Sequence, residues 1–168
     1  MKNALLLNEA SRWIGITEQG GNNRGQLVQL FQKAVDGSAS AEPWCMSFVQ
    51  YCVKMAEAQL AAAGQPVHSK LFRSEHCQTV FQKSAALKCE PKPGAIIVWA
   101  HYKAGKNTGQ GHTGIVRAVR MDGMLETVEG NTGDGAGVVR DGDGVFKRLR
   151  SPKGDGDMRV LGFLDPWA

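Results

Sequence analysis

The sequence lacks any run of apolar residues that approaches the ~20 needed to cross a bilayer as a helix. The apolar residues near its start, Ala4 to Leu7, form too short a segment for a secretory signal peptide, and Asn8, Glu9 and Arg12 follow closely. We therefore expect a protein that is made in the cytoplasm without a signal peptide and that does not insert into a membrane.

Cysteine is scarce, with four residues in a chain of 168. A disulfide framework is not expected in so long a chain without a secretory signal, and the Cys-x-x-Cys pairs typical of zinc sites are missing. What is left is one reactive thiol together with small buried ones. The Asp- and Gly-containing segments at 141–144 and 155–157 lack the ligand pattern of a calcium-binding EF-hand. We expect no cofactor and no bound metal.

A strong charge imbalance is also missing. The chain has 20 Lys and Arg against 16 Asp and Glu, a net charge of +4. This mild excess suits a polyanionic partner such as a cell wall, but it is equally compatible with no particular partner. Because the basic residues are scattered, we expect no nucleic-acid binding. The length, the absence of repeats and the absence of a long linker predict a single domain over residues 1–168.

The two halves of the chain differ in hydrophobic period. The first half has helical spacing, and the second has β-rich runs between Gly and Asp turns, which suits its share of the 21 glycines. The order of helices followed by an antiparallel meander predicts an α+β fold, with N-terminal helices packed on an antiparallel sheet. The helices expected are 2–14, 27–35 and 44–63, and the strands are 95–99, 113–120, 124–129, 138–140, 145–150 and 159–163.

Cys45 follows Pro43 and Trp44 at the predicted start of the longest helix. Unpaired N–H groups in the first turn of a helix place partial positive charge beside such a sulfur and favour the nucleophilic thiolate. The residue type alone favours a buried structural thiol, whereas the position at a helix start favours a nucleophile. Cys52, two turns later, is assigned to the core.

A nucleophilic cysteine needs a base, and four histidines are available: His68, His76, His101 and His112. His112 lies between a Gly-rich segment, Lys106–Gly111, that we expect to be a loop, and the apolar run that begins a strand. Glu129, near the end of the next predicted strand, is placed by a hairpin to orient the imidazole. Asn131 is a second polar aid. Taken alone, Glu129 to Thr132 is also an ordinary turn sequence.

Three segments of the sequence together resemble the CHAP family of peptidoglycan hydrolases, within the papain-like group that includes the NlpC/P60 enzymes. They are Pro43-Trp44-Cys45, Gly111-His112-Thr113-Gly114 and Glu129-Gly130-Asn131, and the resemblance extends from about Glu42 to Asn131. It implies a papain-like fold and catalytic roles for Cys45, His112, Glu129 and Asn131. Some members hold calcium in an Asp-rich loop before the cysteine, but that stretch here offers only Asp36 and Glu42.

The resemblance implies cleavage of an amide bond in bacterial peptidoglycan, by an N-acetylmuramoyl-L-alanine amidase or a peptide endopeptidase, as in small phage and prophage members. We expect a monomer that acts in the periplasm or cell wall as an endolysin delivered through a holin, or as an antibacterial effector toxin with an immunity protein. The alternative is a non-catalytic cell-wall-binding module on the same fold. Six residues are candidates for substrate binding: Glu18, Asn22, Asn23, Trp44, Trp99 and His101.

Overall fold

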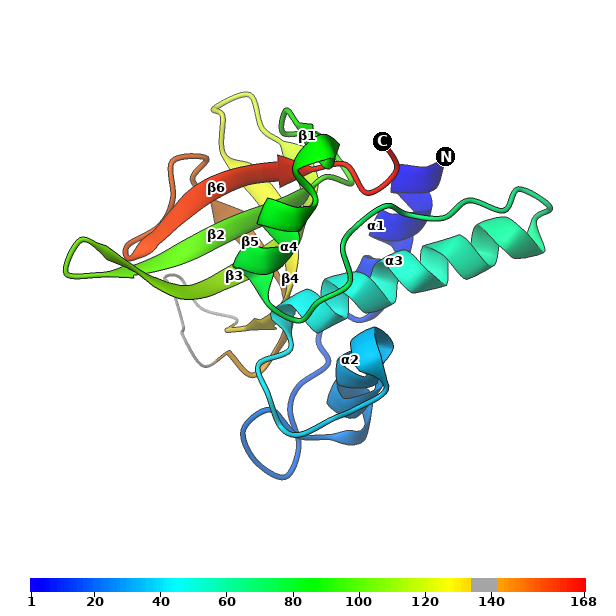
Figure 1. Cartoon of the computed structure of the whole chain (residues 1–168), viewed down its shortest axis with the longest axis horizontal. Coiled ribbons are helices and arrows are strands. Elements are labelled where there is room, and N and C mark those ends of the chain that lie inside the picture. The colour runs from blue at the N-terminus through cyan, green and yellow to red at the C-terminus, as the bar shows by residue number, and fades with distance from the viewer. Residues whose placement is uncertain (134–141) are drawn as a thin grey trace.

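The computed structural model describes residues 1–133 and 142–168. Its helices are α1 (Lys2–Arg12), α2 (Gln26–Asp36), α3 (Cys45–Ala62) and α4 (Cys77–Lys83), followed by a short 3₁₀ turn at Ala85–Leu87. Its strands are β1 (Lys88–Cys89), β2 (Ile96–Lys103), β3 (Lys106–Val119), β4 (Leu125–Thr132), β5 (Gly144–Arg150) and β6 (Met158–Leu164). Helices come first along the chain and strands second, as the change of hydrophobic period predicts (Figure 1).

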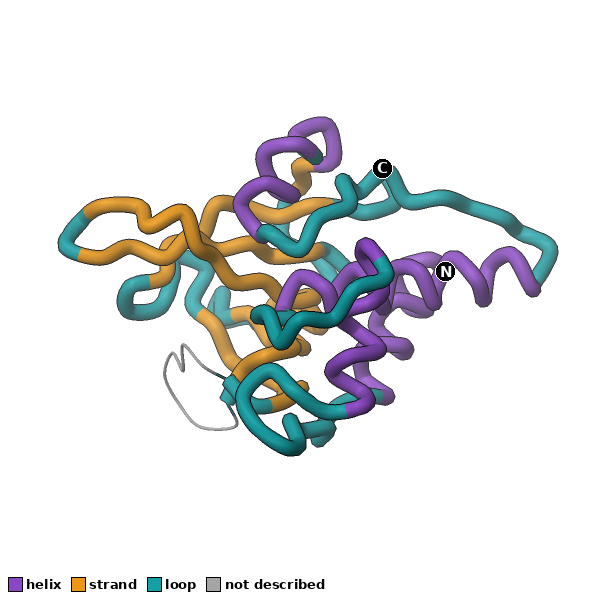
Figure 2. The backbone as a smooth tube through the Cα atoms, turned by 60° about the horizontal axis from the view of Figure 1, so that its bottom comes forward, coloured by secondary structure: helices purple, strands orange, loops and turns teal. Residues whose placement is uncertain are grey.

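The strands form one antiparallel sheet in the order β1-β6-β2-β3-β4-β5. Strands β2 to β5 are a meander of neighbours in sequence, and β6 returns to pair with the other edge of β2. Figure 2 shows α1, α2 and α3 gathered beside the sheet, while α4 lies apart from them. The predicted α+β fold, with helices packed on an antiparallel sheet, is confirmed.

The larger hydrophobic core lies between these helices and the sheet. Residues such as Phe31, Phe48 and Val98 are fully buried there. A smaller cluster, which includes Ile97, Trp99 and Val116, packs separately. Because neighbouring strand residues such as Val98 and Trp99 point to opposite faces, the two clusters lie on opposite sides of the sheet. The sheet is therefore held from both sides, which fixes the side chains of its central strands.

Helix α3 begins at Cys45, one residue later than the sequence predicts. Trp44 is the N-cap, with φ −119° and ψ 17°, and Pro43 precedes the helix. The helix packs against β3 and β4, and Gly130 allows the approach, since a Cβ there would lie 2.7 Å from Cβ of Phe48. The glycine between Glu129 and Asn131 thus places α3 against β4.

The segment Lys106–Gly111 is not the loop expected from its glycines. It is the first part of β3, and it extends the β2–β3 hairpin through the pairs Tyr102↔Asn107 and Lys103↔Lys106. The turn consists of Ala104 and Gly105, both with positive φ (48° and 75°), a geometry that suits two-residue hairpins. His112 therefore lies inside a long strand rather than at its start. Strand β2 also continues past residue 99, its predicted end, and includes His101.

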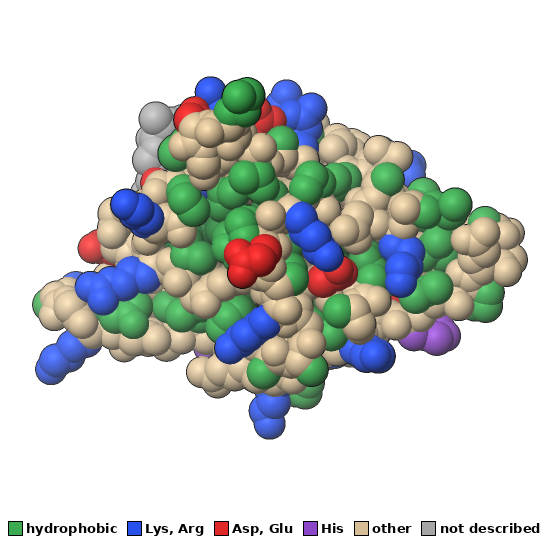
Figure 3. All heavy atoms as spheres, turned by 90° about the horizontal axis from the view of Figure 1, so that it is seen from above, with side chains coloured by type: hydrophobic (Ala, Val, Ile, Leu, Met, Phe, Trp, Pro, Cys, Tyr) green, Lys and Arg blue, Asp and Glu red, His purple; other side chains and the backbone are tan. Residues whose placement is uncertain are grey.

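Other boundaries differ less. Helix α1 ends at Arg12 rather than residue 14, and β4 continues past Glu129 to Thr132. The strand predicted at residues 138–140 lies outside the described residues. Among residues 1–133 and 142–168, no helix is long and apolar enough to span a membrane. On the face shown in Figure 3, Lys and Arg side chains are spread among other types.

Candidate active site

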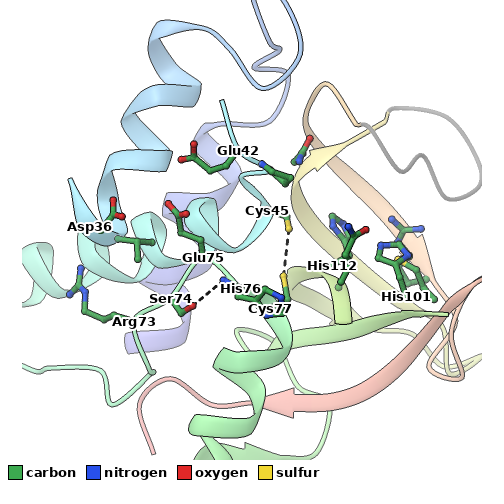
Figure 4. A pocket seen from close by; sticks show the side chains of 17 residues that line it. Asp36, Glu42, Cys45, Arg73, Ser74, Glu75, His76, Cys77, His101 and His112 are labelled. Atoms are coloured by element: carbon green, nitrogen blue, oxygen red, sulfur yellow. Dashed lines mark hydrogen bonds between the residues drawn. The ribbon is translucent and has the colours of Figure 1, made fainter. Parts of the chain in front are cut away.

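The start of α3, the start of α4 and the middle of β3 border one cavity of about 790 Å³. Cys45, Cys77 and His112 line it, together with Asn131 of β4 and Arg150 of β5. In Figure 4, His112 and His101 lie on one side of Cys45, and Asp36, Glu42 and Glu75 lie on the other. The structure therefore brings together three segments that are far apart in sequence.

Cys45 is the first residue of α3 and is 6 % exposed. Its sulfur lies 3.6 Å from that of Cys77. Hydrogen bonding with Cys77 lowers the pKa of Cys45 well below its usual value, against the effect of burial, and His112 and the backbone N–H of Met46 act in the same direction. The helix N-terminus therefore lowers the pKa of Cys45, as expected, through the N–H of Met46. The thiol of Cys77 lowers this pKa more.

His112 is held from two directions. It pairs with Trp99 across the β2–β3 ladder, and the two rings stack with centroids 5.7 Å apart and an interplanar angle of 23°. Its Nε2 lies 2.8 Å from Oε2 of Glu129, which leaves Nδ1 as the ring nitrogen for the cysteine sulfur. Burial alone lowers the pKa of His112, but its interactions with Cys45 and Glu129 outweigh burial and raise it to about 9.

Glu129 is fully buried and is surrounded by donors. Arg150 donates from Nε to Oε1 at 2.8 Å and from Nη2 to Oε2 at 2.6 Å, while Thr127 donates its hydroxyl to Oε1 at 2.6 Å. Burial raises the pKa of Glu129, but the bonds with Arg150 and His112 dominate and lower it to about 2. The carboxylate is therefore charged at neutral pH, and its two oxygens are fixed in orientation.

Asn131 lies two residues beyond Glu129 on β4. It is 8 % exposed, has a left-handed backbone (φ 52°), and lines the cavity with Cys45 and His112. Its Oδ1 is buried and has no hydrogen-bond partner among the described residues. Asparagine tolerates this backbone region better than most residues. His101, which also lines the cavity, is the one candidate substrate-binding residue found there.

The other five candidate substrate-binding residues lie elsewhere. Trp99 is fully buried behind His112, and Trp44 is fully buried against Phe31. Glu18 accepts from Nε1 of Trp44 at 2.9 Å and from the backbone N–H of Asn23 at 2.8 Å. This carboxylate therefore ties the segment between α1 and α2 to the start of α3. Asn22 is exposed on that segment, outside the cavity lining.

The two remaining histidines are not part of the His112–Glu129 pair. His76 is the N-cap of α4 and accepts from the N–H of Thr79 at 3.4 Å, and its exposed side chain borders the cavity. His68 lies in the irregular segment between α3 and α4. Within residues 1–133 and 142–168, no three His, Cys, Asp or Glu side chains come together as a potential metal site.

Sequence reasoning misses two residues of the site. Arg150 is 2 % exposed and binds Glu129 through two bonds, but in the sequence it is one of several basic residues on an exposed-looking strand. Cys77 falls by type among the small buried thiols. Its place at the start of a short helix, after His76, is an available signal, because that is also the local setting of Cys45.

The fold and the site together define an α+β protein in which a helix-borne cysteine and a strand-borne His–Glu pair share one cavity. The CHAP domain family model matches residues 37–131, more than half of the chain, so the protein belongs to the CHAP domain family. The match spans Cys45, His112, Glu129 and Asn131. Membership gives the general function of a peptidoglycan hydrolase, with peptidoglycan as the substrate. No curated protein matches the chain.

Proposed function

We propose that the protein is a cysteine-dependent hydrolase that cleaves an amide bond of peptidoglycan, as an N-acetylmuramoyl-L-alanine amidase or as a peptide endopeptidase. The observation that carries this proposal is the shared cavity of Cys45 and His112, with His112 bonded to Glu129 at 2.8 Å. The lowered pKa of Cys45 and the raised pKa of His112 support a thiolate–imidazolium pair.

The reaction begins with attack of the Cys45 thiolate on the carbonyl carbon of the scissile amide. The backbone N–H of Cys45 is suited to stabilise the resulting oxyanion, because N–H groups in the first turn of a helix have no intrahelical acceptor. The His112 imidazolium then protonates the amide nitrogen, the C–N bond breaks, and the amine leaves a thioester on Cys45. Water, deprotonated by His112, hydrolyses the thioester and releases the carboxylic acid, which restores the Cys45 thiolate and the His112 imidazolium.

Glu129 acts on His112 and not on the substrate. It orients the ring through Nε2, directs Nδ1 toward the sulfur, and stabilises the imidazolium. Because the pKa of His112 is about 9, the imidazolium persists below that pH and is lost as pH rises through it. Asn131 is suited to a supporting polar role, since its buried Oδ1 borders the cavity.

The test is the Cys45→Ala variant on purified sacculi, with Cys89→Ala as the matched control because Cys89 lies on β1, outside the cavity lining. Cys45→Ala is expected to lower the release of muropeptides ~10³-fold or more, while the control retains the wild-type rate. Mass spectrometry of the products assigns the bond: a free L-alanine N-terminus indicates an amidase, and a cut within the peptide indicates an endopeptidase.

The alternative is a cell-wall-binding module without catalysis. It predicts that wild-type protein and Cys45→Ala sediment equally with sacculi and that neither releases soluble fragments, an outcome that would overturn the enzymatic proposal. As the biological setting we propose the cell wall. The protein would reach it through a holin, as an endolysin, or through a secretion system, as an effector with an immunity protein. Lysis on periplasmic but not cytoplasmic expression is the expected result.

A further inference from the structure

We propose that Cys77 is a positioning residue for the nucleophile, whose thiol donates a hydrogen bond to the sulfur of Cys45 and stabilises it as the thiolate. The inference rests on the proposed role of Cys45. The two sulfurs are 3.6 Å apart, within hydrogen-bonding range for this atom type, and both side chains line the catalytic cavity (Figure 4).

The position of Cys77 is fixed by contacts outside the pair. Its neighbour Gln78 donates a hydrogen bond from Nε2 to the carbonyl oxygen of Gln110 at 2.6 Å. The side-chain amides of Gln78 and Asn107 also form two hydrogen bonds with each other, each of 2.9 Å. Gly111 completes the contact, since a Cβ there would lie 3.1 Å from Cβ of Cys77. The first part of β3 therefore holds the start of α4 beside the strand that carries His112.

The direction of the hydrogen bond follows from the surroundings of the two sulfurs. Cys45 has His112 and the N–H of Met46 beside it, and both favour a negative charge. The pKa of Cys77 is raised well above its usual value, first by its bond with Cys45 and then by burial, so it keeps its proton and remains a donor. A thiol is a weak donor to a neutral acceptor, but a charged acceptor strengthens the bond.

Other charged groups share the cavity, and a pH profile reports on all of them. Besides His112, they are Asp36, Glu42, Arg73, Glu75, His76, His101 and Arg150. In Figure 4, the three carboxylates lie across Cys45 from His112. Substituting Cys77 leaves every one of these groups in place, so a change in the profile is assigned to the thiol.

The experiment measures the rate at which iodoacetamide alkylates Cys45 as a function of pH, by peptide mass spectrometry. Cys77→Ala is expected to move the midpoint up by about one pH unit, making alkylation roughly tenfold slower on the acid side. Cys77→Ser retains a hydroxyl donor and is expected to recover part of the shift. Cys89→Ser, a thiol change outside the cavity, is expected to match the wild type.

Superimposable profiles for Cys77→Ala and the wild type would overturn the proposal, since a thiol that merely packs leaves the ionisation of Cys45 unchanged. Alkylation does not require hydrolysis, so this outcome is distinct from failure of the proposed function, which Cys45→Ala tests.

A second measurement needs no variant. Diamide takes two protons and two electrons from a pair of adjacent thiols, which form a disulfide while diamide is reduced to its hydrazine. In the wild-type protein the Cys45–Cys77 linked peptide is expected to be the main product, and its absence would show that the sulfurs are not neighbours.

Discussion

Arg150 is a buried charged residue that contacts both neighbours of the His112 ring. Its guanidinium fork binds both oxygens of Glu129, and its centre lies 5.6 Å from the ring of Trp99, which in turn stacks on His112. One buried cation thus contacts both groups that orient the imidazole. Burial by itself favours the protonated form of a carboxylate. Glu129 nevertheless keeps its charge, because the cations Arg150 and His112 beside it stabilise the carboxylate.

We predict that Arg150→Lys lowers kcat/KM about tenfold, because a lysine keeps the charge but cannot form the two parallel bonds that orient Glu129. The pH dependence of kcat/KM is expected to change as well, since the orientation and charge of Glu129 set the pKa of His112. Arg120→Lys, in the exposed turn before β4, is the control and should leave both quantities unchanged. An Arg150→Lys enzyme with wild-type kcat/KM at every pH would contradict the orienting role.

Among the elements of the fold, close packing around glycines connects the two strand motifs of the site. Gly114 is two residues beyond His112 on β3, and a Cβ there would lie 2.6 Å from Cγ of Glu129 and 3.1 Å from the carbonyl oxygen of Val128. The glycine after His112 and Thr113 therefore provides the space that the carboxylate of β4 occupies. Gly130 does the same for α3, through its approach to Phe48.

Gly114→Ala is accordingly expected to displace Glu129, lowering kcat at least about tenfold and destabilising the fold by roughly 1–3 kcal/mol through overpacking. The control is Gly123→Ala, in an exposed turn with φ 81°. It should cost about 1 kcal/mol of backbone strain yet retain wild-type activity per folded molecule. Thermal unfolding and sacculus digestion measure the two effects separately. Equal activity of the two variants would count against the packing argument.

For the molecule as a whole, the buried charges of the site make stability depend on pH. The folded-state pKa of Glu129 is about 2, below its ordinary value of 4.5. A depressed carboxylate pKa contributes stability above the unfolded-state value, and this contribution is lost as pH falls through the folded-state value. The window for Glu129 is therefore between about pH 4.5 and pH 2, and the contribution is on the order of 3 kcal/mol.

We predict that the free energy of unfolding of the wild type exceeds that of Glu129→Gln near neutral pH, and that the gap narrows as pH falls through this window. Urea denaturation at a series of pH values gives the measurement. Since the glutamine side chain of the variant has no charge to titrate, the difference between the two proteins isolates the carboxylate from the other acidic groups. A gap that stays constant as the pH falls from neutral through the whole window would be inconsistent with a depressed pKa.

Local sequence patterns are enough to establish the class of the fold and to point to the main chemical groups of the site. The period of the apolar residues changes once along the chain, from helical to strand-like. This period can be read directly from the sequence, because it depends only on the spacing of residues close together in the chain. The start of α3 at Cys45 and the hairpin between His112 and Glu129 are local features of the same kind. The catalytic roles of these residues, and the single-domain organisation of residues 1–168, stay predictions.

Which side chains surround those groups is known only from the folded chain. The glycines of Lys106–Gly111 suggest a loop, but pairing with β2 makes the segment a strand. The sequence suggests a substrate cleft lined by Trp44, Trp99 and Glu18. In the structure both tryptophans are fully buried, Glu18 accepts a hydrogen bond from Trp44, and none of the three lines the cavity. Arg150 and Cys77 reach the site from β5 and α4 through packing and burial, which no local pattern encodes. Such contacts depend on which distant segments become neighbours when the sheet packs against α3.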